Sequence, residues 1–219
     1  MVIVRVVDMN PFIVIRTIHI VFGAVALFIA PLAMVTAKGG FWHRRWGKIY
    51  FWAMAGVAVT AAAMCWLRTG LFMFFIAILS FYLAITGYRV LKRKKATDKP
   101  QTMDWGISLV LALAGGGMIV LGAMSNDPSD RWIKIIFGVI SLRIGAADLV
   151  RFFKPAPTER AWMIAHMMRF LGAYIATVTA FSVVNFKFLP ELVRWLWPTV
   201  IGTVGIVVWR NYYIRKFKE

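Results

Sequence analysis

The sequence predicts an all-α protein: a polytopic membrane bundle of seven transmembrane helices that forms one domain over residues 1–219, with the N-terminus outside and the C-terminus in the cytoplasm. Hydrophobic residues make up 61% of the chain and charged residues 16%, whereas soluble domains average about 45–50% apolar and about 25% charged residues. Apolar runs of spanning length follow one another with short connections between them. Lys and Arg gather in alternate connections, which is the pattern of a chain that crosses a bilayer repeatedly.

Seven apolar runs have the length of about 20 residues that a spanning helix needs. They cover residues 11–36, 49–67, 71–91, 105–124, 132–153, 160–185 and 192–213. Gly39 follows the first run, where a residue without Cβ readily takes the left-handed conformation that ends a helix. Asp104 is placed to cap the fourth helix, because an acidic side chain favours a helix N-terminus. The segment PAPTE at 155–159 supplies prolines that stop the fifth helix and a Thr-Glu pair that caps the sixth.

The distribution of basic residues predicts the orientation. Seventeen of the 26 Lys and Arg residues lie in the connections after the first, third and fifth runs, beyond the seventh run, or within four residues of these segments. The positive-inside rule puts these segments in the cytoplasm. In a soluble chain the net charge of +17 would suggest a nucleic-acid partner. At helix ends it instead predicts contacts with anionic lipid headgroups, and we expect membrane lipids, not nucleic acid, as partners.

Away from the ends of the fifth and sixth runs lie four charged or histidine side chains: Arg143, Asp148, His166 and Arg169. A rise of about 1.5 Å per residue puts all four within roughly 5–13 Å of the cytoplasmic edge, so they could meet. At this depth such groups normally face protein or a wet cavity and have a partner. One carboxylate cannot neutralise two guanidinium groups, which favours a bound anion such as a lipid phosphate, a propionate or a small carboxylate. The alternative is that Asp148 bridges one arginine and locks two helices together.

Two further histidines are candidates for binding. His19 lies in the outer half of the first run, about 9 Å from His166 in depth. Haem held between His19 and His166 would need them at similar depth, so packing histidines with ordinary hydrogen bonds are favoured. His43 belongs to the connection after the first run, next to a basic cluster: Lys38, Arg44, Arg45 and Lys48. This loop either anchors lipid headgroups or forms a phosphate-binding turn.

Several kinds of chemistry find no support in the residues. The single cysteine, Cys65, excludes an intrachain disulfide and a cysteine metal cluster. There is no HExxH motif, no pair of carboxylates at depth and no serine with a convincing His and Asp partner. The sequence therefore predicts no metal site and favours a protein that is not an enzyme.

Motifs along most of the chain, above all HRRWGKIY at 43–50 and HMMRFLGAYIATVTAF at 166–181, resemble those of a family of bacterial predicted membrane proteins of uncharacterised function. The resemblance implies a multi-helix bundle in the bacterial cytoplasmic (inner) membrane and implies no particular reaction. It also directs attention to His19, His43 and His166, on which the resembling motifs are built.

The leading interpretation is an integral membrane protein with an inward-facing polar site that binds or transports a small anionic solute or protons. Arg143, Asp148, His166 and Arg169 line this site, and His166 titrates close enough to neutral pH to exchange protons. Two alternatives stay open: a haem- or quinone-handling redox protein that uses His19 and His166, and a structural or assembly subunit of a membrane complex. The sequence predicts neither the solute nor the oligomeric state.

Overall fold

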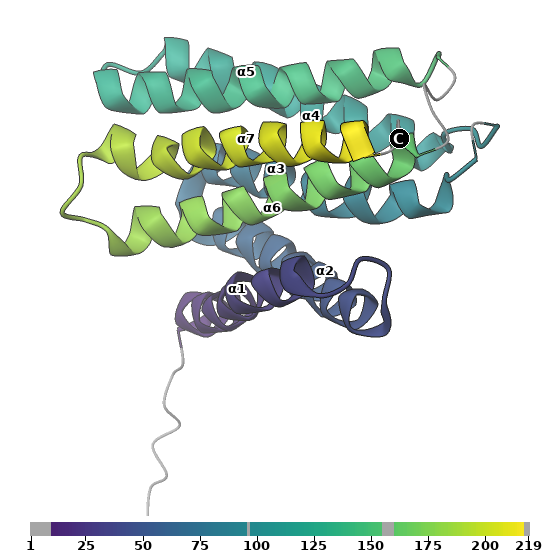
Figure 1. The fold of residues 1–219 in the computed structure, drawn as a ribbon. Helices are drawn as coiled ribbons and strands as arrows, with labels where there is room; N and C mark the ends of the chain where they lie inside the picture. Colours follow the sequence, from purple (N-terminus) through teal and green to yellow (C-terminus); the bar gives the residue numbers. More distant parts are fainter. Residues whose placement is uncertain (1–9, 96, 155–159, 217–219) are drawn as a thin grey trace, which may run out of the picture.

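The computed structural model describes residues 10–95, 97–154 and 160–216. These residues form seven long α-helices (Figure 1). They are α1 (Pro11–Val35), α2 (Phe41–Met64), α3 (Gly70–Arg89), α4 (Thr102–Ala123), α5 (Pro128–Arg151), α6 (Ala161–Asn185) and α7 (Glu191–Lys216). A π-helical turn, Cys65–Thr69, joins α2 to α3, and a 3₁₀ turn, Val90–Lys92, extends α3. The stop and cap predicted at 155–159 lie outside the described residues.

The bundle is built from neighbouring helices that pack in pairs. α1 packs against α2, α4 against α5 and α6 against α7, while α3 contacts α2, α4 and α6 from the middle. Figure 1 shows the α1–α2 and α3–α4 connections, the end of α5, the start of α6 and the end of α7 at one end, on the right of the view, with the α4–α5 and α6–α7 connections at the other. The first of these ends, which we call the basic end, carries most of the Lys and Arg residues counted above.

Among the described helices, six are long and apolar enough to cross a membrane: α1, α2 with its π turn, α3, α4, α6 and α7. Large apolar side chains cover the outside of the bundle, as at Phe28, Trp66 and Val204, which are 71%, 91% and 61% exposed. This architecture is compatible with a multi-pass integral membrane protein, and the prediction of a helical bundle is confirmed. α5 is more charged than the other six helices, so its assignment as a seventh span stays a prediction.

The connection between α1 and α2 is shorter than the sequence predicts. Gly39 takes the left-handed conformation with φ of +77°, as expected, but α2 already begins at Phe41. His43, Arg44, Arg45 and Lys48 are therefore helical, and Lys38 alone of the predicted loop cluster lies in the connection. The correction has a simple cause: hydropathy marks only the apolar part of a helix, and no proline interrupts the polar residues before it.

Close backbone contact joins α4 to α5. A Cβ added to Gly115 would lie 2.8 Å from the carbonyl oxygen of Gly138, and one added to Gly138 would lie 2.8 Å from the carbonyl oxygen of Gly115. A Cβ added to Gly145 would likewise lie 2.8 Å from the carbonyl oxygen of Ser108. These glycines therefore serve close helix packing. The contact brings the last turns of α5 against the first turns of α4, where polar side chains gather.

Candidate functional site

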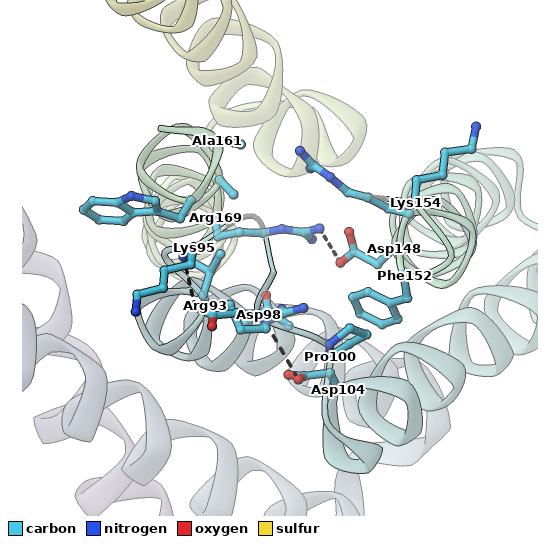
Figure 2. A pocket seen from close by; sticks show the side chains of 15 residues that line it. Arg93, Lys95, Asp98, Pro100, Asp104, Asp148, Phe152, Lys154, Ala161 and Arg169 are labelled. Carbon is cyan, nitrogen blue, oxygen red and sulfur yellow. Dashed lines mark hydrogen bonds and ion pairs between the residues drawn. The ribbon is translucent and has the colours of Figure 1, made fainter. Parts of the chain in front are cut away.

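A pocket of about 130 Å³ opens at the basic end, among the ends of α3, α4, α5 and α6 (Figure 2). Basic side chains outnumber acidic ones in its lining. The basic side chains are Arg93, Lys95, Arg151, Lys154 and Arg169, and the acidic ones are Asp98, Asp104 and Asp148. A second pocket of about 200 Å³ adjoins it, because Arg93, Asp98 and Asp104 line both.

The inner wall of the pocket is a chain of polar contacts across four helices. Asp148 of α5 forms an ion pair with Arg169 of α6, and the same carboxylate oxygen, Oδ2, accepts a hydrogen bond from the hydroxyl of Tyr82 on α3. Because Tyr82 donates to Asp148, its oxygen is left to accept from Ser108 of α4, at 2.9 Å. The guanidinium of Arg169 also lies over the Tyr82 ring, 5.4 Å from its centroid. Each polar group at this junction thus has a partner, as burial requires.

A second ion pair holds the α3–α4 connection. Asp104 is 2% exposed, and its Oδ1 accepts from Nε of Arg89 at 2.7 Å. The other oxygen of Asp104 accepts from the backbone N–H of Gln101 at 2.9 Å, which completes a capping box at the start of α4. Arg89 reaches further, to the side-chain oxygen of Gln101 at 2.9 Å. The predicted cap at Asp104 is confirmed, and the same side chain also fixes the end of α3.

The cations around the pocket outnumber their acidic partners. In the part of the chain that the structure describes, Lys95, Arg151 and Lys154 form no ion pair, and the ion pairs of pocket-lining residues are those of Asp104 and Asp148. Arg93 is only loosely held: its Nε lies 3.9 Å from Asp104, is buried and has no hydrogen-bond partner, while its guanidinium lies over the Phe152 ring. The carboxylate of Asp98 accepts from the backbone N–H of Lys95. The pocket therefore carries uncompensated positive charge.

Two of the four residues predicted to line one site come together, and two lie elsewhere. Asp148 and Arg169 form the ion pair and line the pocket. Arg143 is exposed on α5 and does not line it. The cause is helical geometry: at about 100° per residue, positions five apart point roughly 140° apart, so Arg143 and Asp148 cannot share a face. His166 does not line the pocket either; its Nδ1 is bonded to the carbonyl oxygen of Gly87 at 2.9 Å.

The remaining histidines occupy two different places. The ring of His43 lies 6.2 Å from that of His166, centroid to centroid, so α2 and α6 bring these two together. His19 lies between α1 and α2, with Nδ1 2.9 Å from the hydroxyl of Thr60. The basic residues predicted beside His43, namely Arg44, Arg45 and Lys48, are exposed on the first two turns of α2.

Sequence reasoning missed Tyr82, Ser108 and the ion pair of Arg89 with Asp104. A signal for Ser108 was present, since it lies four residues after Asp104 and hence on the same face of α4. Tyr82 lies in an almost wholly apolar run, where an aromatic side chain is normally assigned to packing. Its role depends on α5 and α6 being its neighbours, which the sequence does not specify.

Comparisons with known proteins add no relative. No family model, no curated protein and no solved structure matches the chain. The resemblance described above therefore rests on the quoted motifs alone.

Proposed function

We propose that the protein is an integral membrane protein that binds a small anion in the pocket at its basic end and passes it across the bacterial inner membrane. The observation that carries the proposal is the excess of cationic side chains: Lys95, Arg151 and Lys154 line the pocket without an ion-pair partner among the described residues. The volume of about 130 Å³, at about 30 Å³ for each liquid water, suits an inorganic phosphate or a short carboxylate.

The membrane topology that goes with this function has seven spans, with the N-terminus outside. α5 is the span that hydropathy supports least. Its length of 24 residues corresponds to about 36 Å at 1.5 Å per residue, enough for a hydrocarbon core of about 30 Å. Except for Arg143, which is exposed in the body of the helix, its charges lie near its two ends or are paired inside the bundle, as at Asp148. With the basic end in the cytoplasm, the pocket faces inward.

In this proposal the polar chain behind the pocket is the barrier to the solute. Arg169 and Tyr82 hold Asp148 between α3, α5 and α6, which closes the pocket toward the membrane interior. An anion that competes with Asp148 for Arg169 would loosen the contact between α5 and α6. Two of the three arginines that line the pocket supply the recognition: Arg151 at the end of α5 and Arg169 beside Asp148 are suited to planar, two-pronged contact with a carboxylate or phosphate.

Titration calorimetry of the protein in detergent, with inorganic phosphate and with succinate as probes, tests anion binding. We expect the double substitution Arg151→Gln with Lys154→Gln to weaken binding at least about tenfold, since charge-assisted contacts are worth about 1.5–3 kcal/mol each. Arg143→Gln is the control, because it removes one positive charge from α5 away from the pocket; the single variant Arg151→Gln matches it in charge and helix. Unchanged affinity in the double variant, or an equal loss in the control, contradicts the proposal.

Uptake into proteoliposomes then separates transport from binding alone. The same double variant is expected to lower the initial rate of uptake of the anion that calorimetry identifies, whereas Arg143→Gln leaves that rate unchanged. If the protein binds the anion but shows no uptake above protein-free vesicles, the binding site is supported and the proposal of transport is contradicted. A phospholipid that co-purifies and blocks the pocket would assign the site to a headgroup instead.

A further inference from the structure

A pair of histidines lies outside the pocket, at the start of two helices that are far apart in the sequence. His43 is on the first turn of α2, and His166 is on the second turn of α6. Their ring centroids are 6.2 Å apart, with an angle of 69° between the ring planes. Both side chains are partly buried. The proposed anion site uses neither of them.

The two rings are held by the same kind of hydrogen bond. Nδ1 of His43 lies 2.9 Å from the carbonyl oxygen of Ala33, and Nδ1 of His166 lies 2.9 Å from the carbonyl oxygen of Gly87. A carbonyl oxygen can only accept, so each Nδ1 carries the proton. In the neutral ring this leaves Nε2 with a free lone pair. A backbone carbonyl that fixes the tautomer in this way is the arrangement that orients metal-binding histidines.

The spacing of the rings favours ligands on opposite sides of one metal. Nitrogen ligands lie about 2.0–2.1 Å from a metal, so two imidazoles bound to one ion have ring centroids roughly 5 Å apart at a tetrahedral angle and roughly 6.3 Å apart when they are trans. The observed 6.2 Å is close to the trans value. The hydrogen bonds of both Nδ1 atoms point to backbone, and no hydrogen bond joins the two rings in the described chain.

The ligand count then decides the kind of metal centre. The described residues contain no group of three or more His, Cys, Asp or Glu side chains that could hold a metal ion. A bare ion between His43 and His166 would thus lack the three or four protein ligands that such sites use. Haem iron needs only axial ligands from the protein, because the porphyrin supplies the other four nitrogens. With one cysteine in the chain, covalent attachment through a CxxCH motif is impossible.

We propose that His43 and His166 are the axial ligands of one noncovalently bound, b-type haem. The surroundings fit such a group. A Cβ added to Gly47, one turn after His43 on the same face, would meet nothing within 4 Å, so no neighbouring side chain packs against α2 at this glycine. The ring of Phe170 lies 4.8 Å from that of His166 and gives the site an apolar wall. Arg44 and Lys48 are exposed on a neighbouring face of the same turns of α2, where they supply positive charge near this end of the helix for the propionates.

This site replaces the pairing of His19 with His166 that the sequence left open. His19 is held against Thr60, between α1 and α2. It therefore serves as the control: a partly buried histidine of the same bundle that is not a proposed ligand. Because the pocket and the histidine pair share no residue, the haem proposal and the anion proposal can be tested and contradicted independently.

Absorption spectroscopy of the full-length protein tests the proposal. The protein is produced in cells supplied with a haem precursor, purified in mild detergent and offered hemin. We expect about one haem per chain by pyridine haemochromogen assay, a Soret band, and sharp α and β bands after dithionite reduction, as six-coordinate haem gives. His43→Ala and His166→Ala should each lower haem content about tenfold or more, and His19→Ala should leave it unchanged. Imidazole added to His43→Gly should restore the six-coordinate spectrum if the substitution removed only the ligand and left the fold intact.

Three results overturn the proposal. The first is a wild-type protein that elutes as a monodisperse species and shows no Soret band after hemin is offered. The second is a haem signal that survives loss of both His43 and His166 or disappears with His19. The third is copper or zinc that metal analysis finds at one ion per chain, lost in His43→Ala, in a protein without haem.

Discussion

Tyr82 donates its hydroxyl proton to the carboxylate of Asp148, which joins α3 to α5 across 66 residues of sequence. Asp148 accepts from Arg169 through the same oxygen, so one carboxylate connects three helices. The arrangement neutralises Arg169 at a depth where a free charge would be expensive. It is both the floor of the pocket and a fastening of the bundle, and the first two predictions separate these roles.

Asp148→Asn is expected to destabilise the bundle by about 3 kcal/mol, because removal of one partner leaves Arg169 uncompensated in a largely buried position. Thermal unfolding in detergent measures the effect. The double variant Asp148→Asn with Arg169→Gln should recover part of the loss, since it removes both charges. Asp98→Asn is the control, because among the described residues the Asp98 carboxylate bonds to the backbone of Lys95 alone. A double variant as unstable as the sum of its two single variants would contradict a direct pairing.

Tyr82→Phe removes the hydroxyl that joins Ser108 to Asp148 and leaves the ring under Arg169 in place. We expect a loss of about 1–3 kcal/mol, the cost of unsatisfied buried polar groups. Tyr88→Phe serves as the control, because the Tyr88 ring stacks on Phe51 outside this junction. Equal melting temperatures for Tyr82→Phe and the wild type would show that the hydroxyl contact contributes nothing to stability.

Neighbouring glycines of α4 should respond in opposite directions to the same substitution. Gly115→Ala puts a methyl 2.8 Å from the carbonyl oxygen of Gly138, so α4 and α5 must move apart and the protein should melt at a lower temperature. Gly116→Ala meets nothing within 4 Å and should stabilise the helix by up to about 1 kcal/mol. Paired melting curves measure both. A fall in stability in both variants would point to a contact on the outer face of α4 instead.

Labelling of single cysteines tests the proposed topology. In a Cys65→Ser background, Lys187→Cys lies in the connection between α6 and α7, and Lys38→Cys lies between α1 and α2. We expect a membrane-impermeant maleimide to label Lys187→Cys in intact cells and Lys38→Cys only after permeabilisation. The reverse pattern would place the basic end outside. Labelling of both positions in intact cells would mean that the connections do not alternate.

Periodicity and charge predicted the helical architecture well, because long apolar runs and clustered basic residues leave few alternatives in a bilayer. Helix starts were less accurate: α2 begins at Phe41 instead of Ile49, since polar residues at a helix end carry no hydropathy signal. For the site, depth alone brought Asp148 and Arg169 together correctly. Depth could not exclude Arg143, because its exclusion depends on the direction in which each side chain points around α5. Depth also could not identify His43 as the neighbour of His166.

The glycine contact between α4 and α5 also bears on how the protein is made. α5 is too charged to enter a bilayer readily by itself. The ion-pair partner of Asp148 is on α6, which is synthesised later. A nascent chain that ends after α5 would therefore hold an unpaired acid beside a helix with little affinity for lipid. If α5 spans the membrane as proposed, the close backbone contact at Gly115 and Gly138 lets it insert together with α4 as a hairpin. In that topology the ion pair of Asp148 with Arg169 forms later, once α6 has been synthesised.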